Sequence, residues 1–325
     1  MTDPLKLTCA GYARVMPLVT GEIALEGGKM ELLLGALGSW PERATMLKRA
    51  LTDPAVHGGE ASMGVHLARI GRGDRSFVAL PIFVLRNFTA RDIYIRQGAP
   101  LHTASDLAGK RVGMYSWTAS GSIWYRHFLA HHGVDIPGVA WTIGEIDKPS
   151  AGKPDPAWPT FVHPAPEGRT LAEMLLAGDL DAIYSPPRPN AYHPVDGPIA
   201  RLYPDAHTVE LAYFKATGIC PPQHLMVLRR DVWEADPTLA RRVTEAFIRC
   251  ETRFLEGITA FPYTTPWQDQ DLEAATASLG PNPYTHGIEQ NRKAMQEFCA
   301  QGHRLGLTPN LVTVEDYFAE YLKPD

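Results

Sequence analysis

The chain has few cysteines, no long apolar run and no excess of positive charge. Its four cysteines are widely scattered and form no Cys-x-x-Cys pair, which predicts reduced thiols. Two disulfides are the alternative interpretation. No stretch approaches the roughly 18 consecutive apolar residues of a membrane span, so we expect no membrane partner. The net charge of -5, without any basic run, argues against nucleic acid as a partner.

The signatures of several enzyme classes are also absent. The sequence contains no Gly-x-Ser-x-Gly elbow, no P-loop and no dinucleotide fingerprint, so nothing indicates phosphoryl or hydride transfer. Its 12 histidines show no His-Glu-x-x-His or other metal-ligand spacing. An alternative interpretation is a divalent-metal lyase that uses scattered histidines as metal ligands, but no sequence motif supports it.

The first ten residues bear on the expected compartment. They include an acidic residue at position three, and their apolar run is far too short for a secretory signal. We therefore expect a cytoplasmic protein, although a chain trimmed of its signal peptide would look much the same.

The residues that are present predict an α/β protein of two domains. With 325 residues, 45% apolar and 21% charged, the chain is typical of globular proteins and long enough for two domains. Short apolar runs alternate with amphipathic segments. We expect strands at 5–9, 77–83, 91–96, 111–114, 181–184 and 225–228. We expect helices at 44–51, 62–70, 120–132, 170–178, 237–254 and 288–300, and a surface loop over 149–168.

These elements can form two α/β lobes joined by crossing segments near 88–95 and 217–228. We assign residues 1–90 and 220–325 to lobe I and residues 91–219 to lobe II. Such a layout predicts a ligand cleft between the lobes.

The stretch from 213 to 237 has residue types that suit a site for a small anion. His224 precedes an apolar strand, Tyr213 lies upstream in a polar, aromatic turn, and Arg229 and Arg230 follow the strand. His224 is the best acid–base candidate, because the unperturbed pKa of imidazole lies nearest neutrality. A lone histidine is nevertheless more often structural.

Two other arginines and one helix start are candidates for binding a carboxylate. Arg86 follows the strand 77–83, and Arg188 lies on a proline-rich loop directly after a strand, where α/β proteins tend to bind ligands. Thr118 and Ser120 lie at a helix start, where backbone N–H groups and the helix dipole favour an anion. The competing interpretations are solvated or surface-paired arginines and a helix cap without a ligand.

Several segments together resemble the family of 4,5-dihydroxyphthalate decarboxylases over nearly the whole chain. They are, in order, Phe77–Phe83, Arg86–Phe88, Ile93–Ile95, Asp106–Gly113, Tyr203–Asp205, Tyr213, Thr217–Ile219, His224, Arg229–Asp231, Tyr284–Arg292 and Gly306–Pro309. Ala13 and Thr20 depart from the family pattern, because aspartate is usual at both positions. These departures lie in a loop near the expected cleft and leave another hydroxylated aromatic acid open as substrate.

The resemblance implies a two-lobed fold like that of type II periplasmic solute-binding proteins. It also implies a carboxy-lyase of phthalate catabolism that converts 4,5-dihydroxyphthalate to 3,4-dihydroxybenzoate and CO2. This chemistry needs no cofactor in principle. His224 is then expected to transfer the proton, with Tyr213 as its hydroxyl partner.

Arg86 and Arg188 are expected to anchor the retained carboxylate, assisted by the helix end at Ser120, with Thr118 and Arg14 also in the binding site. The expected partner is a small aromatic carboxylate, and we expect a homo-oligomer. The alternative function is a solute-binding protein or a cytosolic sensor for such an acid without turnover, because function depends on the site rather than on the fold.

Overall fold

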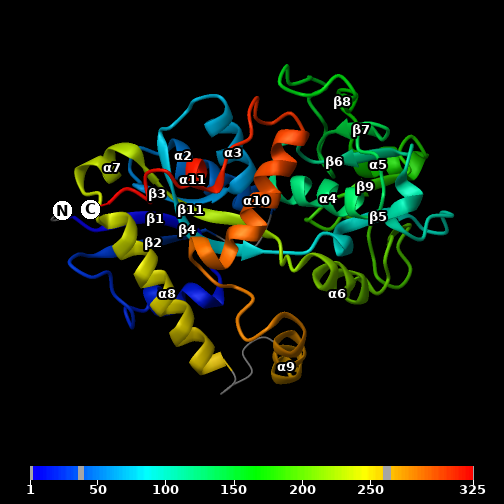
Figure 1. The fold of residues 1–325 in the computed structure, drawn as a ribbon. Coiled ribbons are helices and arrows are strands. Elements are labelled where there is room, and N and C mark those ends of the chain that lie inside the picture. The colour runs from blue at the N-terminus through cyan, green and yellow to red at the C-terminus, as the bar shows by residue number, and fades with distance from the viewer. Residues whose placement is uncertain (1–2, 36–39, 259–264, 325) are drawn as a thin grey trace. The chain divides into compact units, whose positions relative to one another are not determined.

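The computed structural model describes residues 3–35, 40–258 and 265–324, which form two compact units (Figure 1). The first unit comprises residues 1–86, 222–299 and 310–325, and the second comprises 87–221 and 300–309. Each unit contains one sheet and several helices, so the predicted α/β class is confirmed. None of the helices within the described ranges combines the length and the apolarity needed to cross a membrane.

The first unit is built on a five-stranded sheet in the order β2-β1-β3-β11-β4. Its strands are β1 (Leu5–Ala10), β2 (Met30–Gly35), β3 (Gly58–Ser62), β4 (Phe77–Arg86) and β11 (Pro222–Arg229). β1 pairs in parallel with β2 and β3, whereas β11 runs antiparallel to β3 and β4. The carboxyl ends of β1, β3 and β4 therefore lie at the same edge as the start of β11.

Most of the helices belong to the first unit. They are η1 (Ala13–Val15), α1 (Met16–Val19), α2 (Trp40–Thr52), α3 (Met63–Gly71), α7 (Arg230–Ala235), α8 (Leu239–Ile258), α9 (Gln268–Leu279), α10 (Ile288–Arg304) and α11 (Val314–Tyr317). α10 begins in this unit, and its last residues belong to the second. The predicted helices at 44–51, 62–70, 237–254 and 288–300 are confirmed as α2, α3, α8 and α10, with ends that differ by a few residues.

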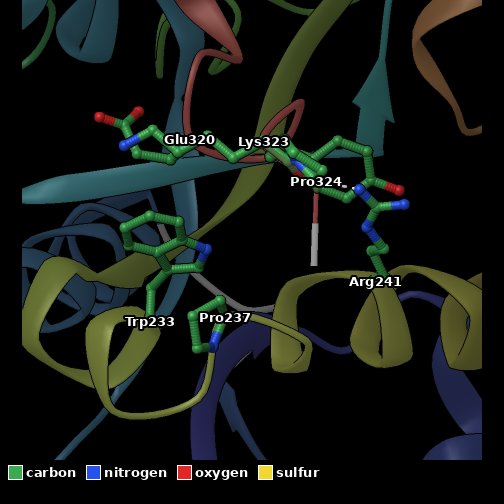
Figure 2. A pocket seen from close by; sticks show the side chains of 7 residues that line it. Trp233, Pro237, Arg241, Glu320, Lys323 and Pro324 are labelled. Carbon is green, nitrogen blue, oxygen red and sulfur yellow. Dashed lines mark hydrogen bonds between the residues drawn. The ribbon is translucent and has the colours of Figure 1, made fainter.

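The C-terminal segment packs on α7 and α8 through aromatic and charged contacts (Figure 2). Lys323 Nζ lies 5.0 Å from the centre of the Trp233 ring, and Arg241 donates a hydrogen bond of 2.8 Å to the Lys323 carbonyl. A pocket of about 120 Å³ remains between these residues, Pro237 and Pro324. These contacts hold the end of the chain against the first unit.

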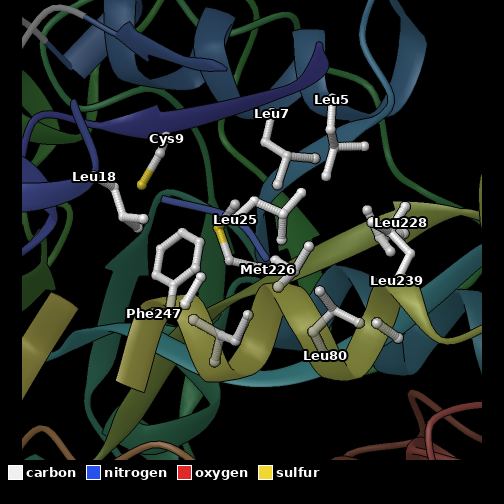
Figure 3. Close-up of a cluster of buried hydrophobic side chains, with 14 of the residues drawn as sticks. Leu5, Leu7, Cys9, Leu18, Leu25, Leu80, Met226, Leu228, Leu239 and Phe247 are labelled. Atoms are coloured by element: carbon white, nitrogen blue, oxygen red, sulfur yellow. The ribbon is translucent and has the colours of Figure 1, made fainter. Parts of the chain in front are cut away.

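One core cluster of the first unit lies between its sheet and α8 (Figure 3). It includes Leu5, Leu7 and Cys9 of β1, Val78, Leu80, Ile82 and Val84 of β4, Met226 and Leu228 of β11, and Leu239, Val243, Phe247 and Cys250 of α8. The residues of β4 alternate, as they must when one face of a strand is turned to the core. Those of α8 are spaced three and four apart, as on the apolar face of an amphipathic helix.

Two glycines allow β3 to approach its neighbours closely. Gly58 has a φ of 147° and Gly59 a φ of 154°, values that favour glycine. A Cβ atom on Gly59 would lie 2.2 Å from Thr8 Oγ1, and one on Gly58 would lie 2.1 Å from the Val227 carbonyl oxygen. The two glycines therefore position the strand that carries Glu60.

We expect Gly59→Ala to lower the free energy of unfolding by more than about 2 kcal/mol, because backbone strain and overlap with Thr8 both oppose the added methyl group. Gly73→Ala is a matched control. Its φ is 77°, but no atom lies within 4 Å, so only the strain of about 1–2 kcal/mol applies. Urea unfolding measures both losses. Equal losses would contradict a close approach at Gly59.

The second unit is built on a six-stranded sheet in the order β10-β5-β9-β6-β7-β8. Its strands are β5 (Ile93–Arg96), β6 (Arg111–Met114), β7 (Ala140–Ile143), β8 (Val162–Pro164), β9 (Ala182–Tyr184) and β10 (Ile199–Arg201). Its helices include η2 (Ala90–Asp92), η3 (Ala104–Leu107), α4 (Ser120–His131), α5 (Leu171–Ala177) and α6 (Ala206–Thr217). The segment 300–309 joins this unit, where Trp117 Nε1 donates to the Leu305 carbonyl at 3.3 Å.

Two expectations for the second unit are wrong. Tyr213 lies in α6 rather than in a turn, because Asp205 caps the start of this helix and Gly218 ends it with a φ of 69°. The expected surface loop over 149–168 contains the short strand β8, which pairs with β7.

Candidate functional site

One edge of the first sheet brings together the residues of the candidate site. β1 ends there at Ala10, β3 at Ser62 and β4 at Arg86, and β11 begins there at Pro222. Ligands of open α/β sheets bind outside the carboxyl ends of the strands. The polar side chains near these strand ends are therefore the first candidates for function.

Glu60 and His224 face each other across β3 and β11. Glu60 lies opposite Met226 and His224 lies opposite Ser62, so the two are diagonal neighbours on one face of the sheet. Glu60 Oε1 lies 2.6 Å from His224 Nδ1. The register between β11 and β4 shifts on both sides of His224, an irregularity of the kind that re-aims side chains next to functional sites.

The buried Glu60 carboxylate accepts further hydrogen bonds from neighbouring groups. The backbone N–H of Ala10 donates to Oε2 at 2.9 Å, while the Tyr12 hydroxyl and Arg43 Nη2 each donate to Oε1 at 2.8 Å. Arg43 also donates to the Tyr12 hydroxyl. Burial alone would raise the pKa of Glu60, but His224, Arg43 and the Ala10 N–H together lower it to about 2. Glu60 is therefore ionised at neutral pH.

His224 is neutral beside this carboxylate. Burial lowers the pKa of His224, and this outweighs the opposing effect of Glu60. Because Nδ1 faces an ionised carboxylate, Nδ1 carries the ring proton and Nε2 keeps its lone pair. Nε2 makes no hydrogen bond to the described residues, and 10% of the side chain is exposed. The pair can therefore act as a general base held in one tautomer.

Sequence reasoning missed Glu60, Tyr12 and Arg43. The one local sign was a glutamate within Gly-Gly-Glu-Ala-Ser, a segment otherwise made of small residues. Nothing in the spacing connected Glu60 with His224, which lies 164 positions further along the chain.

Arg86 is buried at the end of β4, at the same sheet edge as His224. Its Nη2 donates to the Thr285 carbonyl at 2.9 Å and to Asn291 Oδ1. Its guanidinium carbon lies 5.3 Å from the centre of the Phe83 ring. These contacts fix the guanidinium, and its role in anchoring a carboxylate stays a prediction.

Arg14 and the two positions that depart from the family pattern lie after β1. Arg14 Nη2 donates to the Val84 carbonyl at 2.7 Å, and its guanidinium lies 3.8 Å over the Tyr284 ring. Ala13 and Thr20 line one mainly apolar pocket of about 320 Å³. That volume is in the range of small-molecule sites, so the two departures change the same cavity of the first unit.

The paired arginines after β11 do not belong to this edge. Arg229 pairs with Asp231 at 2.5 Å, and Arg230 pairs with Glu320. A strand rises about 3.4 Å per residue, so the five residues from His224 to Arg229 span roughly 17 Å. The two arginines therefore do not join His224 at this edge, and their interpretation as anion-site residues stays a prediction.

Three other predicted binding residues lie in the second unit. Arg188 is exposed on the loop after β9 and is one of the positive charges that act on the buried Asp92. Burial raises the pKa of Asp92 to about 7 despite these charges. Ser120 is buried in the first turn of α4, and Thr118 is half-buried just before it. Their binding roles stay predictions.

A buried arginine lies near the start of α4. Nε of the fully buried Arg126 donates to the Ser122 carbonyl at 2.9 Å, and its guanidinium lies 3.7 Å over the Trp117 ring. Its Nη1 has no hydrogen-bond partner among the described residues. Burial lowers the pKa of Arg126, but an arginine remains protonated. This charge adds to the helix dipole in favouring an anion near Ser120.

The Tyr213 hydroxyl has a hydrogen-bond partner within the second unit. Its hydroxyl lies 2.8 Å from His127 Nδ1, and the His131 ring lies 5.4 Å from its own ring. The hydroxyl that shares a partner with His224 comes instead from Tyr12. The role of Tyr213 as the hydroxyl partner of His224 stays a prediction.

The chain is similar to two curated decarboxylases and to a solved binding protein, while no protein-family model matches it. It is 24% identical, over 97% of its length and 96% of the relative's, to a Comamonas testosteroni protein named 4,5-dihydroxyphthalate decarboxylase. A Pseudomonas putida protein of the same name is 29% identical over 65% of this chain and 81% of its own. The alkanesulfonate-binding protein SsuA from Xanthomonas axonopodis pv. citri matches 98% of this chain and 99% of its own, with 14% identity and a TM-score of 0.51. The resemblance to these decarboxylases and the periplasmic-binding-protein-like α/β fold are confirmed.

Proposed function

We propose that the chain is a decarboxylase of a hydroxylated aromatic dicarboxylate, with 4,5-dihydroxyphthalate as substrate and 3,4-dihydroxybenzoate and CO2 as products. The observation that carries this proposal is the neutral His224, held by ionised Glu60 so that Nε2 is a base. The two relatives that bear the name of this activity support the choice of substrate.

The reaction requires a base and a proton donor and involves no net oxidation. Each carboxylate of the substrate stands para to a hydroxyl group on the ring. His224 Nε2 takes the proton of that hydroxyl, which increases electron density at the carbon that bears the carboxylate. Protonation of this carbon gives a non-aromatic, keto-like intermediate, and loss of CO2 restores the ring.

Each unit has groups suited to the negative charge of the substrate. The first unit carries Arg86 at the edge of the sheet, and the second carries Arg188 and the start of α4 at Ser120. Arginine can bind a carboxylate through two parallel hydrogen bonds, which sets its orientation as well as its affinity. These groups are proposed to select for an acid.

The second candidate function is a solute-binding protein or sensor for a small aromatic acid. The similarity in fold to an alkanesulfonate-binding protein favours it. Under this alternative, the chain would bind the acid saturably and release it unchanged, and the Glu60–His224 pair would only position the imidazole for a hydrogen bond.

Incubation of the purified protein with 4,5-dihydroxyphthalate separates the two functions. Catalytic formation of 3,4-dihydroxybenzoate and CO2 supports the decarboxylase, and saturable binding without product supports the carrier or sensor. A parallel incubation with a chelator tests the metal-dependent alternative. The described residues contain no group of three or more His, Cys, Asp or Glu side chains suited to a metal ion, and we expect turnover to be insensitive to the chelator.

A further inference from the structure

A second buried carboxyl group lies near the edge of the first sheet. Glu251 of α8 is only 5% exposed, and its Oε1 has no hydrogen-bond partner among the described residues. Its Oε2 lies 3.7 Å from His286 Nε2. A buried polar atom that no protein group satisfies is costly, so such an atom calls for an explanation.

His286 is neutral and cannot balance a negative charge on Glu251. The backbone N–H of Phe83 donates to His286 Nδ1 at 3.1 Å, so the ring proton is on Nε2, which faces Glu251. Burial lowers the pKa of His286 to about 3, and Arg86 and Arg14 contribute to this. The pair is therefore a neutral imidazole beside a carboxyl group rather than a salt bridge.

Two arginines act on Glu251 without forming an ion pair with it. Arg14 approaches from η1 and Arg86 from β4, while Asn282 contributes a side-chain hydrogen bond. Within the described part of the chain, neither arginine lies within salt-bridge distance of Glu251. Burial raises the pKa of Glu251 and outweighs these three groups, which gives a value of about 7.

The pKa values of the two buried glutamates of this unit are thus shifted in opposite directions. Glu60 accepts hydrogen bonds from Tyr12, Arg43 and the Ala10 N–H, which stabilise its charge. Glu251 lacks such donors at Oε1, and its pKa of about 7 leaves it partly protonated at neutral pH. Pairs of carboxyl groups with diverging environments divide acid and base roles in enzymes.

We infer that Glu251 is the acid that delivers the proton to the ring carbon, while His224 takes the proton of the para hydroxyl. Its position close to Arg14 and Arg86, at the sheet edge that carries His224, and its unsatisfied Oε1 support this role. The inference rests on the proposed decarboxylase function and adds a residue to it.

The proposed steps balance in atoms and charge. The phenolic O–H bond breaks, and its proton binds His224 Nε2. A C–H bond then forms with the proton of Glu251, which becomes a carboxylate. The bond from the ring to the carboxylate breaks and CO2 leaves. The electron pair of the broken bond stays with the ring and restores the aromatic phenolate. The phenolate recovers the proton from His224, and solvent reprotonates Glu251, so one proton is consumed for each CO2.

The test compares Glu251→Gln with Glu245→Gln, an exposed glutamate on the same helix. Glutamine keeps the shape of a neutral carboxylic acid but cannot donate the proton. We expect Glu251→Gln to lower kcat by about 100-fold or more while the Kd for 3,4-dihydroxybenzoate changes by less than a few-fold. Glu251→Asp, which retains an acid, should keep more turnover than the glutamine variant. Glu245→Gln should behave as the wild type.

A readout without turnover checks the proton directly. The infrared difference spectrum between wild type and Glu251→Gln should contain the C=O band of a protonated carboxyl group below pH 7. This band should disappear above pH 7. If the band instead disappears above about pH 4, Glu251 is ionised at neutral pH and the inference is overturned. A wild-type kcat in Glu251→Gln would also overturn it. Absence of turnover in the wild type would instead remove the proposed function, so the two failures are distinguishable.

Discussion

Replacing His224 by asparagine is expected to lower kcat for 4,5-dihydroxyphthalate by about 10²–10⁴-fold, the usual contribution of a general base. Asparagine occupies a similar volume and can still hydrogen-bond to Glu60, so the carboxylate keeps a partner. It has no basic nitrogen to replace Nε2. Substrate binding should remain measurable, because the arginines that are proposed to bind the acid are unchanged. Steady-state kinetics and a binding titration separate these two effects.

His193→Asn is the matched control for this substitution. The His193 side chain is 60% exposed, and its Nδ1 lies close to the Asp196 carboxylate and to the backbone N–H of Val195, so the variant should keep wild-type kcat. Unchanged turnover in His224→Asn would reject His224 as the proton-transferring group. A loss of binding as large as the loss of kcat would also contradict a role confined to the chemistry.

Replacing Glu60 by glutamine is expected to reduce both turnover and stability. The neutral amide can accept the Nδ1 proton through its oxygen, but it no longer stabilises the positive charge that His224 acquires as a base, so kcat should fall by about 10²-fold or more. It also leaves Arg43 without its buried carboxylate. At pH 7 this should lower the free energy of unfolding by about 3 kcal/mol.

The stability effect should depend on pH in a defined direction. The folded state lowers the pKa of Glu60 from 4.5 to about 2, which corresponds to roughly 3 kcal/mol of stabilisation. Because the folded pKa is depressed, this contribution is complete above about pH 4.5 and is lost as the pH falls toward 2. Wild type and Glu60→Gln should therefore become more alike in stability across this window.

Urea unfolding at pH 7, 4.5 and 3 measures the difference between the two proteins. Glu31→Gln, an exposed glutamate on β2, serves as the control and should differ little from wild type at each pH. A stability difference that stays constant from pH 7 to 3 would contradict an ionised Glu60 with a depressed pKa.

Local sequence signals were sufficient for many elements of the fold. The strand β6 has the predicted bounds, 111–114, and α5 begins at the capping box of Thr170 and Glu173 and ends at Gly178. The helix predicted at 237–254 likewise corresponds to α8, whose apolar residues are spaced three and four apart. These elements were predictable because their caps, stops and periodicity lie within a few residues of each other.

The candidate site was only partly predictable. His224 could be singled out because its residue type has a pKa near neutrality, and Arg86 because it follows a strand. The charge that fixes the tautomer of His224 comes from Glu60, in a glycine-rich strand whose partner lies far away in the sequence. Only tertiary pairing brings these residues together, and the same holds for Glu251 and His286. Helix α6, by contrast, could have been predicted from the sequence, because Asp205 and Gly218 mark its ends.

The most direct test of the central claim is the turnover of His224→Ala with and without added imidazole. Removal of the side chain leaves Glu60 in place and opens the position of the missing base. We predict that the wild type forms 3,4-dihydroxybenzoate catalytically, that His224→Ala does not, and that imidazole restores part of the rate as its neutral fraction increases. Wild-type turnover by His224→Ala without imidazole would contradict the account.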